Sequence, residues 1–266
     1  MDILDKIDQE SGDHFFERIL GPRERIPKTS TLPFDLEPEE IVELSEDLSV
    51  VESSLDIFLL HTICEILNAT STGADVEVLF LKFSHKIKIQ DFATVLRHGY
   101  GLDEERVGHA LKKLHILEVF TLEEFHLAMV QARRHLYGNK MISLLVCDCI
   151  SAFYHLDKQI RSRSFESYCS SVVGSIVDLA REFGISALYG KQEYFAPDKK
   201  KFAPRLKYRL AFESPPEITR NEKQILVKVT VAASAASSTD AAGDTHHIVR
   251  CKFVIESFTS VKLIIL

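Results

Sequence analysis

The chemistry of this sequence centres on one carboxylate, Asp148, which follows an unbroken run of apolar or small residues at 142–147. Such a run is typical of a strand covered on both faces, as in a parallel sheet with helices on each side. Open α/β sheets bind ligands at the carboxyl ends of these strands, and in nucleotide hydrolases an Asp at this position holds Mg²⁺. An Asp that only caps the following turn gives the same pattern, so residues upstream must decide between the two interpretations.

The segment that would hold the phosphates of a nucleotide lies at residues 46–53. A phosphate-binding loop has the pattern G-x-x-x-x-G-K-[ST], because its glycines let backbone N–H groups approach the phosphates and its Lys neutralises them. Here no glycine occurs between residues 22 and 72, and Glu52 stands in the Lys position. Ser53 keeps the hydroxyl that would face Mg²⁺, although a helix cap would account for it equally. Three carboxylates in this segment would repel a triphosphate, so the sequence predicts a degenerate nucleotide pocket.

Basic residues gather in two segments of the second half of the chain. Their cations are Arg161 and Arg163 in the first segment, and Lys199, Lys200, Lys201, Arg205, Lys207 and Arg209 in the second. Phe202 and Tyr208 interleave the second segment, and cations mixed with aromatic rings suit single-stranded DNA. A solvated basic loop next to an edge strand would look the same. The net charge of −7 slightly favours that second interpretation.

Composition limits the class of protein. The 266-residue chain is long for one domain and short for two, and its 45% apolar content is ample for a buried core. Its five Cys residues are an odd number without C-x-x-C spacing, which indicates reduced thiols in a nuclear or cytosolic protein and argues against a zinc site. No apolar run approaches the roughly 20 residues of a membrane span. We therefore expect neither a bound metal nor a membrane partner.

Apolar periodicity places these residues in alternating strands and helices. Strands are predicted at residues 40–44, 76–83, 115–120, 142–147 and 185–189, and helices at residues 53–67, 91–98, 103–114, 122–138 and 172–183. Ser53 with Asp56, and Thr121 with Glu124, have the spacing of capping boxes, and Gly184 is expected to stop the last helix. This alternation predicts an α/β fold with a mostly parallel sheet.

The pattern changes after residue 192. Apolar residues alternate with polar ones at 206–212, 225–231 and 249–255, and a last edge strand is predicted at 261–266. Strands of period two without intervening helices predict an antiparallel extension of the same sheet. Residues 232–247 are rich in Ala, Ser, Thr and Asp and predict a disordered loop. The core is therefore expected to span residues 39–266.

Residues 1–38 form a leader and a proline-rich arm. A short helix is predicted at residues 14–20, with Phe15, Phe16 and Ile19 on its apolar side. Four prolines then favour extended structure between residues 22 and 38. A merely disordered leader is the alternative, but it would leave Phe15 and Phe16 exposed.

The strand V-E-V-L-F at 76–80 and the L-L-V-C-D and S-A-F-Y patterns within 144–154 resemble the RecA-family recombinase paralogues of homologous recombination. The likeness is to the X-ray-repair cross-complementing type, which lacks the N-terminal helical DNA-binding domain, and more narrowly to nematode-type paralogue-interacting proteins. It covers residues 40 to 193 and implies a RecA-like P-loop ATPase core, with residues 142–148 as its Walker B strand.

The resemblance also implies roles for particular residues. Gln192 lies where the family has a Gln that senses nucleotide or DNA, although a polar residue capping a strand end is an equal alternative. Ser84 lies where the family has its catalytic carboxylate, and a Ser cannot polarise water. The two basic segments lie near the family's DNA-facing loops. Family subunits stack head to tail, so Phe15 and Phe16 would hook the next subunit and Asp148 would serve assembly.

We therefore expect a non-catalytic recombinase paralogue without a cofactor. It would pair with an ATP-binding recombinase paralogue in the nucleus and assist the recombinase filament on single-stranded DNA during double-strand-break repair. Two alternatives stay open. The first is an ATPase with an atypical nucleotide loop, and the second is a pseudo-NTPase scaffold outside recombination.

Overall fold

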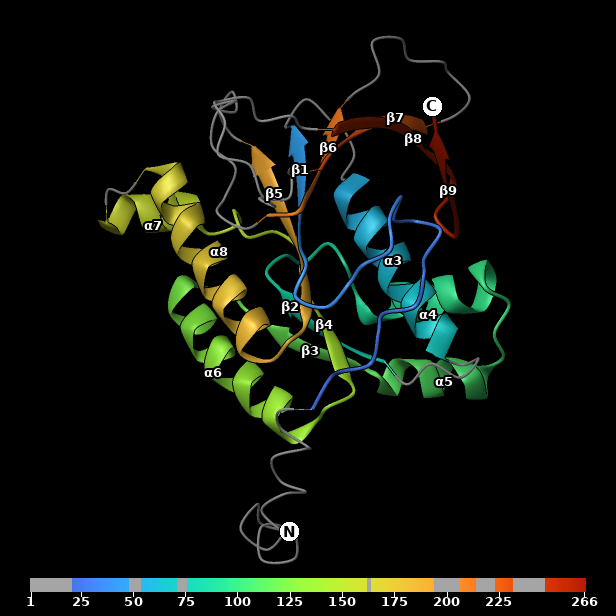
Figure 1. Ribbon diagram of the computed structural model, residues 1–266, viewed down its shortest axis with the longest axis horizontal. Coiled ribbons are helices and arrows are strands. Elements are labelled where there is room, and N and C mark those ends of the chain that lie inside the picture. Colours follow the sequence, from blue (N-terminus) through green and yellow to red (C-terminus); the bar gives the residue numbers. More distant parts are fainter. Residues whose placement is uncertain are drawn as a thin grey trace, which may run out of the picture.

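A computed structural model describes residues 21–47, 54–70, 76–161, 164–193, 206–213, 223–231 and 247–266. Its centre is a nine-stranded sheet in the order β3-β2-β4-β5-β1-β6-β7-β8-β9 (Figure 1). The strands are β1 Ile41–Asp47, β2 Glu77–Lys82, β3 Leu114–Glu118, β4 Ile142–Cys147, β5 Ser186–Glu193, β6 Tyr208–Glu213, β7 Lys223–Val231, β8 His247–Ser257 and β9 Ser260–Ile265. All nine match strands that the sequence predicts, within a few residues.

The sheet is parallel from β3 through β1 and antiparallel from β6 to β9. This confirms the predicted α/β class, with a mostly parallel sheet and an antiparallel C-terminal extension. Strand β6 joins the two parts, because it pairs parallel with β1 and antiparallel with β7. The antiparallel extension therefore lies next to β1, which is the first described strand in the chain.

Helices cover both faces of the parallel part (Figure 1). They are α3 Ser54–Thr70, α4 Ile89–Thr94, the π-helical turn η1 Val95–Gly99, α5 Glu104–Lys112, α6 Leu122–Gly138, α7 Tyr154–Arg161 and α8 Phe165–Glu182. One apolar core lies between the sheet and α3, α4 and α5, and the other lies between the sheet and α6 and α8. Among the described residues, no helix is both long enough and apolar enough to cross a membrane.

Local signals explain most helix boundaries. The Thr121 hydroxyl accepts a hydrogen bond from the Glu124 N–H at 3.1 Å, as the capping box predicts. The Glu124 carboxylate returns to the N–H of Phe120 at 2.7 Å rather than to that of Thr121. Gly184 has a φ of +62° and follows α8, which confirms it as the stop of that helix. The predicted helix at 91–98 is split into α4 and η1.

The antiparallel extension curls over α3 (Figure 1). The ring of Phe58 on α3 packs edge-on against Phe212 of β6 and Phe253 of β8, with centroids 5.2 and 5.4 Å apart. A hydrogen bond of 2.9 Å also joins the His61 ring to the Phe258 carbonyl in the turn after β8. One helix thus packs against both the parallel strands and the C-terminal strands, so β6 and β8 belong to the same core as the parallel strands.

The described part of the proline-rich arm, residues 21–38, packs against that core. The ring of Phe34 stacks on Tyr208 with centroids 3.6 Å apart, and the Thr31 hydroxyl donates to Glu65 near the end of α3 at 3.1 Å. Leu32 and Leu36 are buried in the α3 core. The predicted hook residues, Phe15 and Phe16, lie outside the described residues.

Arg23 fastens the start of the arm. Its guanidinium donates to the carbonyls of Leu136 at 2.9 Å, Asn139 at 2.8 Å, Ile142 at 2.9 Å and Phe183 at 3.0 Å. These carbonyls belong to the C-terminal ends of α6 and α8 and to the start of β4, where the helix dipoles favour a cation. Burial lowers the pKa of Arg23 to about 10, which leaves the side chain charged at neutral pH.

We predict that Arg23→Ala lowers the free energy of unfolding by about 2–4 kcal/mol, because three buried carbonyls and one part-buried carbonyl lose their donor. The matched control is Arg25→Ala, whose side chain is 79% exposed and forms only a 3.6 Å ion pair with Glu37. That change should cost less than about 0.5 kcal/mol. Urea denaturation measures both values. Equal losses of unfolding free energy in the two variants would show that Arg23 does not fasten the arm to these carbonyls.

Candidate functional site

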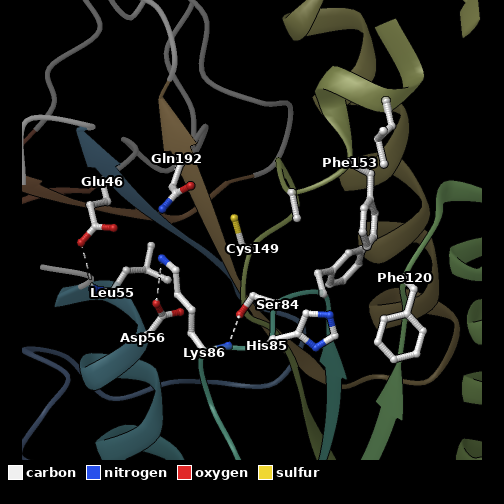
Figure 2. A pocket seen from close by; sticks show the side chains of 13 residues that line it. Glu46, Leu55, Asp56, Ser84, His85, Lys86, Phe120, Cys149, Phe153 and Gln192 are labelled. Carbon is white, nitrogen blue, oxygen red and sulfur yellow. Dashed lines mark hydrogen bonds and ion pairs between the residues drawn. The ribbon is translucent and has the colours of Figure 1, made fainter. Parts of the chain in front are cut away.

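A cavity of about 410 Å³ opens at the carboxyl edge of the parallel strands (Figure 2). Its wall is formed by residues in or just after β1, β2, β3, β4 and β5, together with the first turn of α3. The lining residues are Glu46, Leu55, Asp56, Phe83, Ser84, His85, Lys86, Phe120, Cys149, Ala152, Phe153, Leu156 and Gln192. This is the edge at which open α/β sheets bind their ligands.

Asp148 lies at this edge but directs its carboxylate into the protein. One oxygen accepts from the N–H groups of Phe83 at 2.7 Å and Cys149 at 2.8 Å. The other accepts from the N–H and the hydroxyl of Ser84, at 3.0 and 2.7 Å. Asp148 is fully buried, and burial raises its pKa although the hydrogen bonds from Ser84 and Phe83 favour the charged form. The carboxylate therefore joins the end of β4 to the segment after β2.

The turn after β4 is also tied to β5. The Ile150 N–H donates to the Gly190 carbonyl at 2.8 Å, and the Gln192 N–H donates to the Ser151 hydroxyl at 2.9 Å. A Cβ atom at Gly190 would lie 2.0 Å from the Asp148 carbonyl oxygen and 2.6 Å from Leu55. Glycine is required there because the Asp148 backbone crosses directly over β5.

The N-terminus of α3 already holds an anion from the chain itself. One oxygen of Glu46, at the end of β1, accepts from the N–H groups of Ser54 at 2.8 Å and Leu55 at 3.2 Å. In a phosphate-binding loop, N–H groups at this end of the helix would receive phosphate oxygens. Burial raises the pKa of Glu46, and these two hydrogen bonds offset part of that effect. A helix end that could bind phosphate is thus occupied by a side chain.

Among the described residues that line the cavity, the one Lys or Arg is Lys86, which lies after β2. Its ammonium pairs with the Asp56 carboxylate in the first turn of α3 at 3.3 Å. The Lys86 side chain is half exposed, whereas that of Asp56 is 10% exposed. The pair bridges the segment after β2 to α3 on the polar side of the cavity (Figure 2).

The opposite side of the cavity is apolar. Phe83 packs against Phe153 with ring centroids 5.7 Å apart, and His85 stacks on Phe120 at 5.4 Å. Phe120 and Leu156 remain 46% and 55% exposed at the rim. Figure 2 shows the rings of Phe120 and Phe153 facing Glu46 and Gln192 across the opening. The cavity therefore combines acidic and aromatic walls.

The structure places the residues predicted for this site in three ways. Gln192 lines the cavity, and Asp148 lies at the same edge but faces Ser84 and Phe83. Arg161 is the last residue of α7, and its side chain lies outside the described part of the structure. The remaining predicted residues lie outside the described part of the chain: Glu52, Ser53, Arg163, Lys199, Lys200, Lys201 and Arg205.

Sequence reasoning missed the Glu46 cap and the Asp56–Lys86 pair. Glu46 lies eight residues before Ser54, beyond the range of local capping patterns. Lys86 and Asp56 lie on separate elements, and only the fold brings them together. The segments after parallel strands could have directed attention to Lys86, because all of them meet at one edge.

The described residues provide no set of ligands for a metal ion. Within the described residues, no group of three or more His, Cys, Asp or Glu side chains is arranged to hold a metal ion. The five Cys residues are free and buried. Burial raises the pKa of Cys149 to about 11 and that of Cys147 well above its ordinary value, so neither is a thiolate at neutral pH.

No protein-family model matches the chain, and no curated protein matches it.

We predict that Asp148→Ala lowers the free energy of unfolding by about 3 kcal/mol or more, because the N–H groups of Phe83, Ser84 and Cys149 lose their acceptor. Ser84→Ala removes only the hydroxyl donor and should cost about 1–2 kcal/mol. The matched control is Asp178→Ala on the exposed side of α8, which should change stability by less than about 0.5 kcal/mol. Urea denaturation gives the three values. A loss for Asp148→Ala no larger than that of the control would show that the carboxylate does not support this edge.

Proposed function

We propose that this chain is a non-catalytic, RecA-like recombinase paralogue. In this proposal it pairs with an ATP-binding recombinase paralogue and assists recombinase filaments on single-stranded DNA during double-strand-break repair in the nucleus. The mostly parallel sheet with its antiparallel extension supports a RecA-like core, as do the strand and the Asp148 pattern that resemble that family.

One observation carries the non-catalytic part of the proposal: the groups that would handle a nucleotide are already used within the chain. Glu46 fills the N-terminus of α3, where phosphate oxygens would bind. Both carboxylate oxygens of Asp148 accept hydrogen bonds from Phe83, Ser84 and Cys149, so neither is directed at a metal ion. A phosphate beside Glu46 would meet a like charge, which costs about 4 kcal/mol at 4 Å and intermediate dielectric.

A sheet edge that does not process nucleotide can still serve assembly. The rim of the cavity presents Phe120 and Leu156, large apolar side chains about half exposed. Buried aromatic and aliphatic anchors supply much of the energy at protein interfaces. The leader adds Phe15 and Phe16, which in this proposal hook onto the partner subunit. In this proposal, the residues that would contact DNA are Arg161, Arg163, Lys199, Lys200, Lys201 and Arg205.

We predict that the isolated protein neither binds MgATP with micromolar affinity nor hydrolyses it, because Glu46 and Asp148 are internally satisfied. Isothermal titration calorimetry and a phosphate-release assay measure the two properties. Saturable binding that disappears in Asp148→Ala and persists in Asp178→Ala would favour the alternative of an ATPase with an atypical nucleotide loop.

We predict that Phe15→Ala/Phe16→Ala releases the partner subunit while the chain stays folded. Co-purification from cells, followed by mass spectrometry, identifies what the wild-type protein retains and what the variant loses. The control is Val130→Ala, because Val130 is 63% exposed on α6 and lies outside the leader. Partners unrelated to recombination would favour a pseudo-NTPase scaffold, and an unchanged partner set in the double variant would reject the hook.

A further inference from the structure

The outer face of β7 and β8 carries three cations in a block. Along these strands Val227, Val229, Cys251 and Phe253 point into the α3 core. Side chains alternate between the faces of a strand, so the intervening Lys228, Arg250 and Lys252 point to the opposite face. The core beneath α6 and α8 includes no described residue of β7, β8 or β9, and this face is therefore not covered by those helices.

Strand register brings the three cations together. Lys228 lies directly opposite Arg250 in the antiparallel β7–β8 pair, which sets their Cβ atoms about 5 Å apart. Lys252 follows on the same face of β8, about 7 Å from Arg250 along the strand. Like charges directly opposite each other destabilise a sheet. The fold tolerates this repulsion at the centre of the extension rather than at its edge.

Neighbouring strands show how the chain neutralises cations elsewhere on this face. Lys207 pairs with Glu40, and Arg209 donates to the buried Glu43 at 2.5 Å. Lys262 on β9 pairs with Glu256, also at 2.5 Å. The side chains of Lys228, Arg250 and Lys252 have no hydrogen bond or ion pair within the described part of the chain.

One described carboxylate, Glu213, borders the block, but it lies directly opposite none of the three cations. Glu213 on β6 and Lys252 on β8 both face Leu226 in register, from opposite sides of β7. Two strand spacings separate their backbones by about 10 Å. Glu213 is also the diagonal neighbour of Lys228, which pairs with Ala211 on β6, so this carboxylate borders the block at one corner. Three positive charges therefore share one face, and among the described residues no carboxylate lies directly opposite any of them in register.

We propose that the outer face formed by Lys228, Arg250 and Lys252 binds the phosphodiester backbone of a nucleic acid. A phosphate offers several anionic oxygens, so one group can bridge Lys228 and Arg250 while the next meets Lys252. The Arg250 guanidinium suits bidentate phosphate contact. The net charge of −7 does not prevent this, because charges farther away than about 8 Å are screened at physiological salt.

An acidic polypeptide fits this surface less well. Extended peptides dock on sheets by pairing with an edge strand, which satisfies their backbone N–H and C=O groups. These cations lie on a face formed by interior strands, and β9 separates them from the edge of the sheet. A nucleic-acid strand has no such backbone requirement and binds through charge. This inference stands apart from the proposed recombination role and from the basic segments at 161–163 and 199–205.

The test measures binding of fluorescein-labelled oligo(dT), and of the same length of duplex, to the full chain by fluorescence anisotropy across a salt series. We expect Lys228→Gln/Arg250→Gln/Lys252→Gln to weaken binding at low salt by at least about tenfold. The log–log salt dependence for the single strand should become shallower by about 2, at about 0.7 per phosphate contact. Matched controls are Lys262→Gln, whose charge is already paired with Glu256, and Arg134→Gln on the exposed side of α6.

A charge reversal separates binding from folding. Lys228→Glu places a carboxylate opposite Arg250, so it should raise the denaturation midpoint and still weaken oligonucleotide binding. Equal affinity and equal salt slope in the wild type and the triple variant would overturn the proposal. So would a wild type that binds poly-glutamate but not oligo(dT), or controls that lose as much affinity as the triple variant. None of these measurements depends on ATP or on a partner subunit, so failure here is distinct from failure of the proposed function.

Discussion

The carboxyl edge of the sheet depends on one buried carboxylate. Asp148 accepts four hydrogen bonds from the segment after β2 and from its own strand end. Without it, three backbone N–H groups at this edge would lack an acceptor, and buried polar groups without partners cost about 1–3 kcal/mol each. The close crossing at Gly190 follows from the same arrangement, because the Asp148 backbone is held directly over β5. A carboxylate can bind a metal ion, but that of Asp148 instead links the end of β4 to the segment after β2, and the Asp148 backbone packs on β5.

Other polar groups around the cavity also bind side chains of the protein itself rather than a ligand. Glu46 serves the N-terminus of α3, Asp56 serves Lys86, and Ser84 serves Asp148. Each contact also ties one element to another, so the edge is stabilised by the groups that a ligand would otherwise compete for. A nucleotide would have to displace Glu46 from two N–H groups and leave its charge buried. The contacts of Glu46, Asp56 and Asp148 thus hold this edge together without a glycine-rich loop before α3.

The sequence allowed the sheet and its helices to be predicted because their signals are local. Apolar runs at 142–147 and 185–189, the Thr121 cap and the Gly184 stop each act within a few residues. The candidate site is different, because it depends on contacts between distant segments. Arg23 reaches carbonyls more than 110 residues away, and no local pattern marks it among the other arginines. Asp148 was identifiable by its place after a buried strand, but its partners were not.

Whether a cation of the C-terminal strands is paired depends on its distance from a buried carboxylate. Strand β1 lies next to β6, the strand that joins the parallel and antiparallel parts. Its Glu43 accepts hydrogen bonds from the Tyr189 hydroxyl at 2.8 Å and from Arg209. Strand β6 is next to β1 and can use that acid, whereas β7 and β8 are one and two strands farther out. Alternation of polar and apolar residues was visible in the sequence, but it does not distinguish a paired lysine from an unpaired one. Register supplies that distinction, because Arg209 on β6 lies opposite Glu43, whereas Lys228 and Arg250 lie opposite each other.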